Sequence, residues 1–350
     1  MHKIDCSDYS IFINDYDALS QKLNDNKYSK RIIIVDENTK RECLSEIKAL
    51  STLPLEVIEI ESGEKNKTLD TCQKIWDRMI EIGADRHSLC INLGGGVIGD
   101  MGGFAAATFM RGMDFIQVPT TLLSQVDASV GGKLGIDYHR YKNLIGSIIS
   151  PNGVYIFTDF LTTLPYRQLL SGFAEIIKHA LIHDKEAFDQ YVKFVNLEAI
   201  QWEDVIFESV KIKQVIVEQD PYERGVRKLL NFGHTIGHAI ESYHLEGDHL
   251  LLHGEAVAIG MICETFISSK AMGLSMEKVD RVKKEIIDLY GHRPELIPDT
   301  KNVVELMKQD KKNFNGKTRF TLLEDIGEAQ FDVEVSDALI GESLAFYKEN

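Results

Sequence analysis

Residues 88–100 read Ser88-Leu-Cys-Ile-Asn-Leu-Gly94-Gly-Gly96-Val-Ile-Gly99-Asp100. The first six are mostly apolar, which is typical of a buried strand. The glycines fit the spacing G-x-G-x-x-G, and small residues over 101–109 then predict a helix. Glycines let a diphosphate approach the backbone, and the first turn of a helix offers unpaired N–H donors. A strand, a glycine loop and a helix in this order favour a nucleotide site over a simple packing turn.

Neighbouring runs predict further strands over 31–35, 55–60 and 115–119, with an amphipathic helix over 68–83. Apolar β-branched runs of this length are typical of a parallel sheet covered on both faces. The acid that should read the ribose about twenty residues after the glycine loop is missing. Asp36 and Asn38, at the end of an earlier strand, are the better candidates, so we expect a Rossmann-like variant.

Polar side chains gather after the strand that ends at Pro119. They are Thr120, Thr121, Asp127, Lys133, Lys142 and Asn143, with the turn Gly131-Gly132 among them. A buried Asp–Lys pair can be purely structural. The number of polar groups in an otherwise apolar stretch nevertheless favours a ligand site.

The β-branched strands stop after Asp159, and the rest of the chain predicts helices. We place a domain boundary there, giving domains 1–159 and 160–350 with Pro165 in the link. The expected fold is an N-terminal α/β Rossmann-like domain with a parallel sheet, followed by an all-α, metal-binding domain.

A polar stripe marks the second domain. On one helix over 227–241, the residues Arg227, Asn231, His234 and His238 would share a face because of their three- and four-residue spacing. A guanidinium, an amide and two imidazoles suit a metal and an anionic ligand. His-x3-His alone is more often structural, but His253 adds a third imidazole.

A second helical face carries Glu175, Lys178 and His179, flanked by apolar residues. Glu and Lys three residues apart are usually a solvated pair. Here Glu175 is a plausible metal ligand and Lys178 a plausible contact for an anion. Catalytic zinc commonly takes three protein ligands and keeps a fourth position open, a set that Glu175, His234 and His253 would supply.

The composition limits the class of protein. The chain has 350 residues and a formal charge of −15, so we expect two domains and no general nucleic-acid surface. Five scattered cysteines without CxxC spacing are typical of reduced thiols in a cytoplasmic protein. No apolar run has the length of a membrane span, and the N-terminus lacks a signal core.

Taken together, these segments resemble the 3-dehydroquinate synthase family of sugar phosphate cyclases, which is related to the iron-containing and polyol dehydrogenases. The resemblance runs in order from about Asp36 to Gly327. It rests on the segments 94–100, 117–133, 142–143, 172–179, 227–241 and 253–257.

The resemblance implies a phosphate-eliminating lyase of the shikimate pathway that acts on 3-deoxy-D-arabino-heptulosonate 7-phosphate. It implies bound NAD+, one divalent metal (zinc or cobalt) and a homodimer. A hydride would pass to NAD+, phosphate would leave, the hydride would return, and an intramolecular aldol closure would give 3-dehydroquinate. The leaving phosphate could act as its own base, so no general base is assigned.

The resemblance also implies residue roles. The metal ligands would be Glu175, His234 and His253. The phosphate would be held by Lys178, Asn143, Asn231, His238 and Lys311, with Arg111 from a second subunit. Lys213 and Arg227 would hold the carboxylate, and Glu223 and Lys133 would complete the active site. NAD+ would contact Asp36, Asn38, Glu64, Lys67, Gly95, Gly96, Val97, Asp100, Thr120, Thr121, Leu123, Asp127, Lys133, Lys142 and Asn143.

Some positions depart from the family pattern: Leu134, Asp137, Pro221 and the length of 242–252. Lys311 is favoured over Lys312 at the phosphate. Two alternatives are a polyol dehydrogenase, against which the phosphate cations argue, and a cyclase for neutral sugar phosphates. A non-catalytic NAD-binding protein is a third, but such a protein is expected to have lost ligands that are present here.

Overall fold

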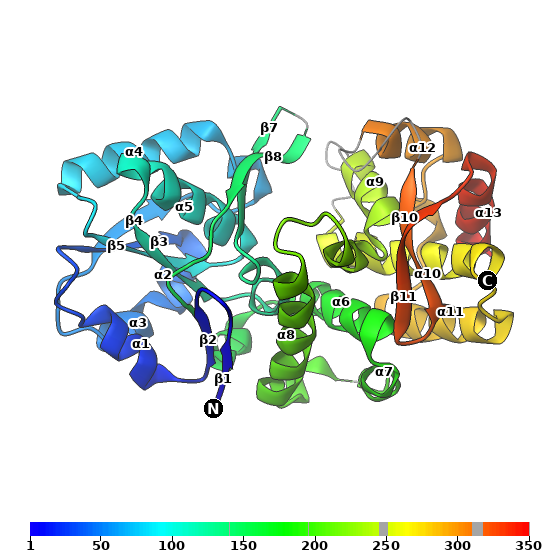
Figure 1. Cartoon of the computed structure of the whole chain (residues 1–350), viewed down its shortest axis with the longest axis horizontal. Helices are drawn as coiled ribbons and strands as arrows, with labels where there is room; N and C mark the ends of the chain where they lie inside the picture. Colours follow the sequence, from blue (N-terminus) through cyan, green and yellow to red (C-terminus); the bar gives the residue numbers. More distant parts are fainter. Residues whose placement is uncertain (140, 195, 245–250, 310–317, 350) are drawn as a thin grey trace. The chain divides into compact units, whose positions relative to one another are not determined.

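A computed structural model describes residues 1–139, 141–194, 196–244, 251–309 and 318–349. The chain forms two compact units, coloured along the sequence in Figure 1. Unit 1 comprises Met1–Pro165 and Gln201–Gln214, and unit 2 comprises Tyr166–Ile200 and Val215–Asn350. The first division thus follows Pro165, somewhat beyond the expected boundary at 159/160.

The segment Gln201–Gln214 groups with unit 1, although the sequence placed it in the second domain. It forms the first part of α8 (Trp202–Gln219). The Phe207 ring stacks on the His2 ring with the centroids 4.3 Å apart. Contacts between residues so distant in the chain leave no local signal in the sequence.

A mostly parallel sheet organises unit 1. Among the described residues its spatial order is β1 (His2–Asp5), β2 (Ser10–Ile13), β9 (Val154–Ile156), β6 (Asp114–Pro119), β5 (Leu89–Gly94), β3 (Arg31–Asp36) and β4 (Glu56–Ile60). β1 pairs antiparallel with β2, and the remaining neighbours pair in parallel. The strands predicted over 31–35, 55–60, 88–93 and 115–119 are confirmed, whereas β1, β2 and β9 were not predicted.

Helices connect these strands. They are α1 (Tyr16–Leu23), α2 (Glu37–Glu42), α3 (Leu44–Ala49), α4 (Leu69–Ile82) and α5 (Gly96–Thr108), with short helical turns at Glu64–Asn66, Phe109–Arg111, Ser124–Ala128 and Thr158–Thr163. α4 matches its prediction, because the Thr68 side chain caps its start and Gly83, at φ 72°, ends it. α5 starts at Gly96 and not at 101, so the glycine loop leads directly into its first turn. A hairpin of β7 (Lys133–Tyr138) and β8 (Tyr141–Ile148) completes the unit.

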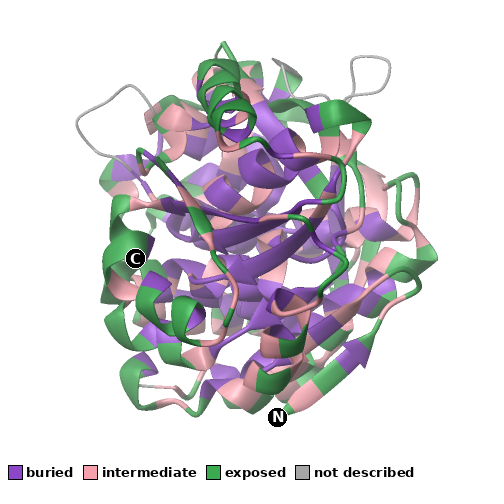
Figure 2. Ribbon diagram, turned by 90° about the vertical axis from the view of Figure 1, so that its left-hand side faces the viewer, coloured by how far each residue is buried: buried purple, intermediate pink, exposed green. Residues whose placement is uncertain are grey.

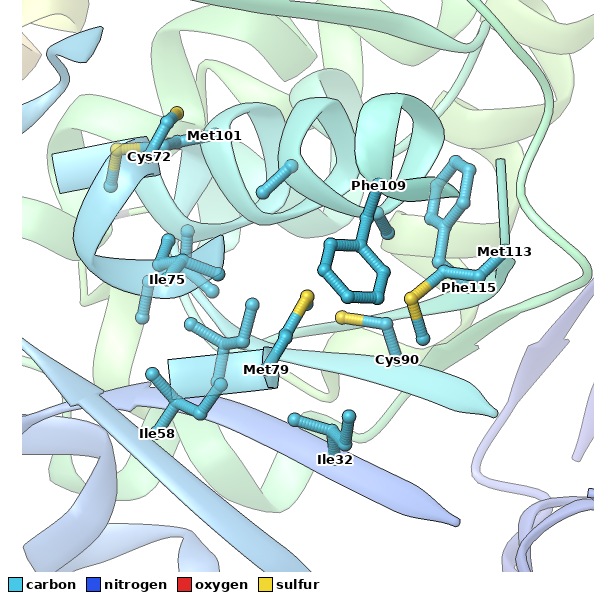
Figure 3. Packing of buried hydrophobic residues seen from close by; sticks show 14 of the residues in the cluster. Ile32, Ile58, Cys72, Ile75, Met79, Cys90, Met101, Phe109, Met113 and Phe115 are labelled. Carbon is cyan, nitrogen blue, oxygen red and sulfur yellow. The ribbon is translucent and has the colours of Figure 1, made fainter. Parts of the chain in front are cut away.

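Both faces of the sheet are buried, which is why its strands read as continuous apolar runs. Along β3, Ile32 and Ile34 belong to the core under α4 and α5, whereas Ile33 and Val35 belong to the core under α1 and α3. Figure 2 shows the strands as buried ribbon enclosed by helices with exposed outer faces. Figure 3 shows the first core, with Met79 of α4 among strand side chains.

Unit 2 is built mainly of helices, as predicted. They are α6 (Tyr166–His183), α7 (Lys185–Tyr191), α9 (His234–His244), α10 (His253–Ala271), α11 (Met276–Tyr290), α12 (Thr300–Gln309) and α13 (Asp337–Lys348), with short turns at Leu197–Ala199, Val226–Asn231 and Pro294–Leu296. The all-α expectation needs one correction. An antiparallel hairpin of β10 (Arg319–Asp325) and β11 (Glu328–Glu334) packs on α10 and α6 (Figure 1).

α10 is the central helix of unit 2. Every residue from Gly254 to Ser268 is buried, and the helix packs against α6, α9, α11, α13 and β10. It approaches α9 so closely that a Cβ on Gly260 would lie 1.9 Å from the Gly233 carbonyl oxygen. None of the helices in the described ranges has the length and apolar character that crossing a membrane requires.

We expect Gly260→Ala to lower the free energy of unfolding by roughly 1–3 kcal/mol, because the methyl group forces the α9 and α10 backbones apart. Urea unfolding followed by circular dichroism measures the change. Lys270→Ala, at the exposed end of the same helix, is the matched control and should stay within about 0.5 kcal/mol of the parent. Equal stability of the two variants would contradict the close packing.

Candidate functional site

Four side chains of unit 2 that could bind a metal lie together. Glu175 belongs to α6, His234 and His238 belong to α9, and His253 is the first residue of α10. Glu175 Oε1 lies 3.3 Å from His234 Nε2 and 3.4 Å from His253 Nε2. The three histidines offer ring nitrogens within 4.8 Å of one another. The structure thus brings His238 into the same cluster, and its exclusion from the ligand set stays a prediction.

A close contact between α6 and the start of α10 sets this arrangement. The Gly254 N–H donates to Ser171 Oγ at 3.0 Å, and a Cβ on Gly254 would lie 1.9 Å from the Ser171 carbonyl oxygen. Ser171 precedes Glu175 by about one helical turn, so both lie on the same side of α6. The contact therefore places Glu175 next to His253.

The second nitrogen of each predicted histidine ligand has its own acceptor. His234 Nδ1 lies 3.0 Å from the Phe232 carbonyl oxygen, and His253 Nδ1 lies 3.2 Å from Glu241 Oε2. A carbonyl or an ionised carboxylate only accepts, so each Nδ1 donates. In the neutral ring this leaves a lone pair on Nε2, which faces Glu175, and such support is common behind metal-binding histidines.

The donor set fits a divalent cation. Glu175 is fully buried, and its Oε1 has no hydrogen bond of good geometry among the described residues. Lys178 donates to the other oxygen, Oε2. Burial would raise the pKa of Glu175, but Lys178 and His234 hold it well below its ordinary value. A buried carboxylate oxygen that faces two imidazole nitrogens suits zinc or cobalt.

The two histidines differ in charge. Burial lowers the pKa of His234, which favours the neutral ring. Burial also acts against a charge on His253, but the nearby Glu175 and Glu241 carboxylates outweigh burial and raise the pKa of His253 to about 10. In the metal-free protein, a proton on His253 thus supplies positive charge to the carboxylates, and a bound cation would replace that proton.

The prediction of one helix over 227–241 is wrong. Val226–Asn231 forms a short 3-10 turn, and α9 begins only at His234. Gly233 has φ 77°, which is not a helical conformation, so the chain changes direction between the turn and α9. The same residue lies against Gly260 of α10. Arg227 and Asn231 therefore do not extend the histidine stripe.

The residues predicted to bind anions in unit 2 lie around this turn. Arg227 is buried, and its Nη1 donates to the Pro221 carbonyl oxygen at 2.6 Å. Pro221, one of the positions that depart from the family pattern, therefore contacts Arg227 through its backbone. Asn231 Nδ2 donates to Glu223 Oε1 at 2.8 Å, and Glu223 itself has φ 57°. Lys311 and Lys312 lie outside the described residues.

The glycine loop of unit 1 joins β5 to α5 as the sequence predicted. The Thr120 N–H donates to the Gly94 carbonyl oxygen at 3.0 Å, and Gly96 is the first residue of the helix. A Cβ on Gly95 would lie 3.2 Å from Thr121 Cγ2, so the loop backbone and Thr121 are close neighbours. The start of α5 therefore carries the unpaired N–H groups of a helix N-terminus, the geometry that a diphosphate requires.

A buried ion pair lies near the helix start. Lys67 Nζ donates to Asp100 Oδ2 and to Asn143 Oδ1, both at 2.5 Å, and the residue is 3% exposed. Burial acts against its charge, but Asp100 and Glu64 outweigh burial and raise the pKa of Lys67. Lys142 Nζ lies 3.2 Å from Glu64 Oε1. Five predicted cofactor contacts are thus linked to one another.

Other predicted residues of unit 1 have structural partners. Asp36 caps α2, because its Oδ1 accepts from the N–H groups of Asn38 and Thr39. Lys213 Nζ donates to Asp127 Oδ1 at 2.6 Å. Val97 and Leu123 are half-buried and Lys133 is exposed. Their roles toward a ligand stay predictions.

Arg111 belongs to neither of the two groups of unit 1 contacts described above. It is exposed, has φ 68° and lines a hollow of about 660 Å³ together with Arg86, His87, Ser150 and Asn152. A role for it toward a second subunit stays a prediction.

Sequence reasoning missed the residues that hold the histidines. Glu241 shares the helical face of His234 and His238, at spacings of seven and three, so the polar stripe could have been extended to it. Glu255 Oε2 accepts from the Leu252 N–H at 2.8 Å and caps α10. Arg167, which pairs with Glu255 at 2.7 Å, gave no signal in the sequence.

We expect the metal-free protein to lose stability as the pH rises from about 7 to 10. The pKa of His253 is near 6.5 in an unfolded chain and about 10 in the fold, so its contribution is full below pH 6.5 and is lost as the pH rises through 10. Urea unfolding in chelator at several pH values measures this. Because other groups also titrate, the test is the difference from His253→Gln, and parallel curves would contradict the assignment.

Comparison with known proteins gives a consistent result. Residues 57–171 match the family model "3-dehydroquinate synthase N-terminal", and residues 172–313 match "3-dehydroquinate synthase C-terminal". The chain is 42% identical to a 3-dehydroquinate synthase of Parabacteroides distasonis, over 99% of this chain and 97% of that protein. It is 40% identical to one of Clostridium botulinum, over 92% and 93% of the two chains.

Solved structures agree on the fold. A 2-deoxy-scyllo-inosose synthase complexed with carbaglucose-6-phosphate, NAD+ and Co2+ has a TM-score of 0.86 and 25% identity, with 98% of each chain covered. A probable glycerol dehydrogenase from Sinorhizobium meliloti, at 13% identity and a TM-score of 0.59 over 97% of this chain and 96% of that chain, shares the fold alone. With both halves of the family model matched in order, and with close relatives along nearly its whole length, the chain belongs to the 3-dehydroquinate synthase family.

Proposed function

We propose that this protein is a 3-dehydroquinate synthase that converts 3-deoxy-D-arabino-heptulosonate 7-phosphate to 3-dehydroquinate and phosphate. The observation that carries the proposal is the cluster in unit 2. A buried carboxylate oxygen faces two imidazole nitrogens, and the buried cation Lys178 contacts the same carboxylate. This chemistry occurs in a chain 42% identical to a protein of that name.

NAD+ and one divalent ion, zinc or cobalt, are the proposed cofactors. The related 2-deoxy-scyllo-inosose synthase was crystallised with NAD+ and Co2+, which supports both. Glu175, His234 and His253 would hold the metal, and the start of α5 with Thr120, Thr121 and Lys67 would hold NAD+. When bound, NAD+ supplies reversible hydride transfer and the metal supplies a Lewis acid.

The chain's own residues would bind and orient the substrate. Lys178 is buried beside the metal cluster, so a phosphate there would meet a cation that cannot rotate into water. Asn231 is held by Glu223, which directs its amide, and His238 adds a third ring to the cluster. Arg227 offers a guanidinium suited to a carboxylate, and Lys213 keeps its proposed role toward the same acid.

Two alternatives use the same fold. A polyol dehydrogenase needs a metal and NAD+ but has no use for buried cations such as Lys178 and Arg227. A cyclase for neutral sugar phosphates needs the phosphate contacts but no carboxylate contact, so Arg227 is the residue that separates it from the proposed synthase.

We also propose a homodimer in the cytoplasm. The β7–β8 hairpin and the residue after it present apolar side chains to solvent: Leu144, Ile145, Ile148 and Ile149 are each about 40% exposed. Exposed apolar side chains gathered on one hairpin are a common feature of interfaces between copies. Cys43, Cys72, Cys90 and Cys263 are buried free thiols, as in proteins of reducing compartments.

Incubation with the heptulosonate phosphate, NAD+ and Co2+ should release one phosphate per substrate with no lasting rise in NADH absorbance. The hydride leaves and returns within one cycle, so the cofactor is required but not consumed. Phosphate release and absorbance at the NADH band are followed together. Stoichiometric accumulation of NADH would overturn the proposal in favour of the dehydrogenase.

Arg227→Ala should lose roughly 2–5 kcal/mol of transition-state stabilisation with the acid substrate, because the guanidinium is buried where the carboxylate would bind. The value comes from kcat/KM. Arg224→Ala, an exposed arginine of the same loop, is the matched control and should change little. Equal use of sedoheptulose 7-phosphate, or a silent Arg227→Ala, would contradict the assignment to this substrate.

A further inference from the structure

Glu264 is a buried carboxylate in the middle of α10 and has no role assigned toward substrate or cofactor. Its side chain is fully buried. Oε2 accepts from the Gly233 N–H at 2.7 Å, and Oε1 accepts from the Ile236 N–H at 3.1 Å. Both donors belong to the start of α9, the helix that carries His234.

Glu264 therefore caps α9 from another helix. In a local capping box, one side chain accepts from the third helical N–H and another accepts from the N–H of the residue before the helix. Gly233 precedes α9 and has no side chain, and a Cβ there would lie 2.6 Å from Met261 Cγ. The two oxygens of Glu264 do both tasks, because Gly233 precedes the helix and Ile236 is its third residue.

One peptide group links Glu264 to His234. The Gly233 N–H that donates to Glu264 and the Phe232 carbonyl that accepts from His234 Nδ1 belong to the same peptide plane. A peptide that donates to a carboxylate becomes a stronger acceptor at its carbonyl, because hydrogen bonds in a chain polarise one another. The carboxylate thus acts on the imidazole through a rigid, planar unit.

We infer that Glu264 is a positioning residue for His234. By fixing the Phe232–Gly233 peptide, it keeps the proton of the ring on Nδ1 and directs Nε2 toward Glu175 Oε1, 3.3 Å away. His253 receives the same support directly from Glu241. The inference rests on the proposed function in one respect, the use of His234 as a metal ligand.

A purely structural cap would be the competing explanation, and the same unit offers a control for it. Asp184 caps α7, where its Oδ1 accepts from the Ala187 N–H at 3.0 Å. Among the described residues, no histidine is hydrogen-bonded to the Glu186–Ala187 peptide that Asp184 caps. Loss of the Asp184 cap should therefore affect stability without affecting the metal.

The test compares Co2+ binding by the metal-free parent, Glu264→Gln and Asp184→Ala, the second of which removes the α7 cap. Glutamine keeps the shape but replaces one accepting oxygen by an NH2 group, which donates and cannot accept. Competition with a chelator gives the affinity, and visible absorption reports the ligand geometry. We expect Glu264→Gln to bind Co2+ about 10–100-fold more weakly with an altered spectrum, and Asp184→Ala to match the parent.

Parent-like affinity and spectrum in a destabilised Glu264→Gln would overturn the inference, because Glu264 would then only cap α9. If the parent itself binds no Co2+, the metal assignment fails. The inference about Glu264 is then tested by nitrogen NMR of the metal-free proteins, which reports the tautomer of His234. A His234 ring protonated on Nδ1 in the parent and mixed in the variant supports the inference, and identical tautomers overturn it. If Glu264→Gln does not fold, the test uses the parent protein alone. A Gly233 amide proton without the downfield shift of a strong hydrogen bond would overturn the inference that Glu264 fixes this peptide.

Discussion

The close approach of three helix backbones is the constraint on which unit 2 depends. α10 meets α6 at Gly254 and α9 at Gly260, and neither position has room for a Cβ. Packed helices usually lie about 8–10 Å apart, a separation set by the side chains between them. Glycine at both crossings removes that spacer. Glu175 can then meet His234 and His253, which belong to the two other helices.

This packing brings charged groups into the interior, where they are costly unless they are matched. Glu175 is matched on one oxygen by Lys178, and its other oxygen faces the two histidines. In the metal-free fold, the proton on His253 lowers the cost of burying the Glu175 and Glu241 carboxylates, because it supplies a positive charge next to both. Glu175 Oε1 and the Nε2 atoms of both histidines nevertheless converge, and a bound divalent cation would replace that proton.

Local patterns were sufficient where local structure decides. The strand at 31–35 and the helix at 68–83 were predicted because apolar runs and caps are properties of short segments. The break at Gly233 was not, because a tertiary contact with Gly260 accompanies it. Glu241 and Glu264 were overlooked for a related reason. An acid in a helix is normally exposed, and only the fold shows that these two are buried behind histidines.

The two units treat a buried charge differently. In unit 1 the buried cation Lys67 is already satisfied, since Asp100 and Asn143 both accept from it. Such a group keeps its neighbours in place before any ligand binds. In unit 2 the backbone contacts hold an acid and two imidazoles with accepting atoms turned toward one another. Lys178 donates to Glu175 Oε2, but Oε1 faces the two imidazole nitrogens, and buried acceptors that face one another are stable only with a proton or a metal between them. The difference is that Lys67 is already satisfied by Asp100 and Asn143, whereas the Glu175 cluster holds a proton on His253 that a bound divalent cation would replace.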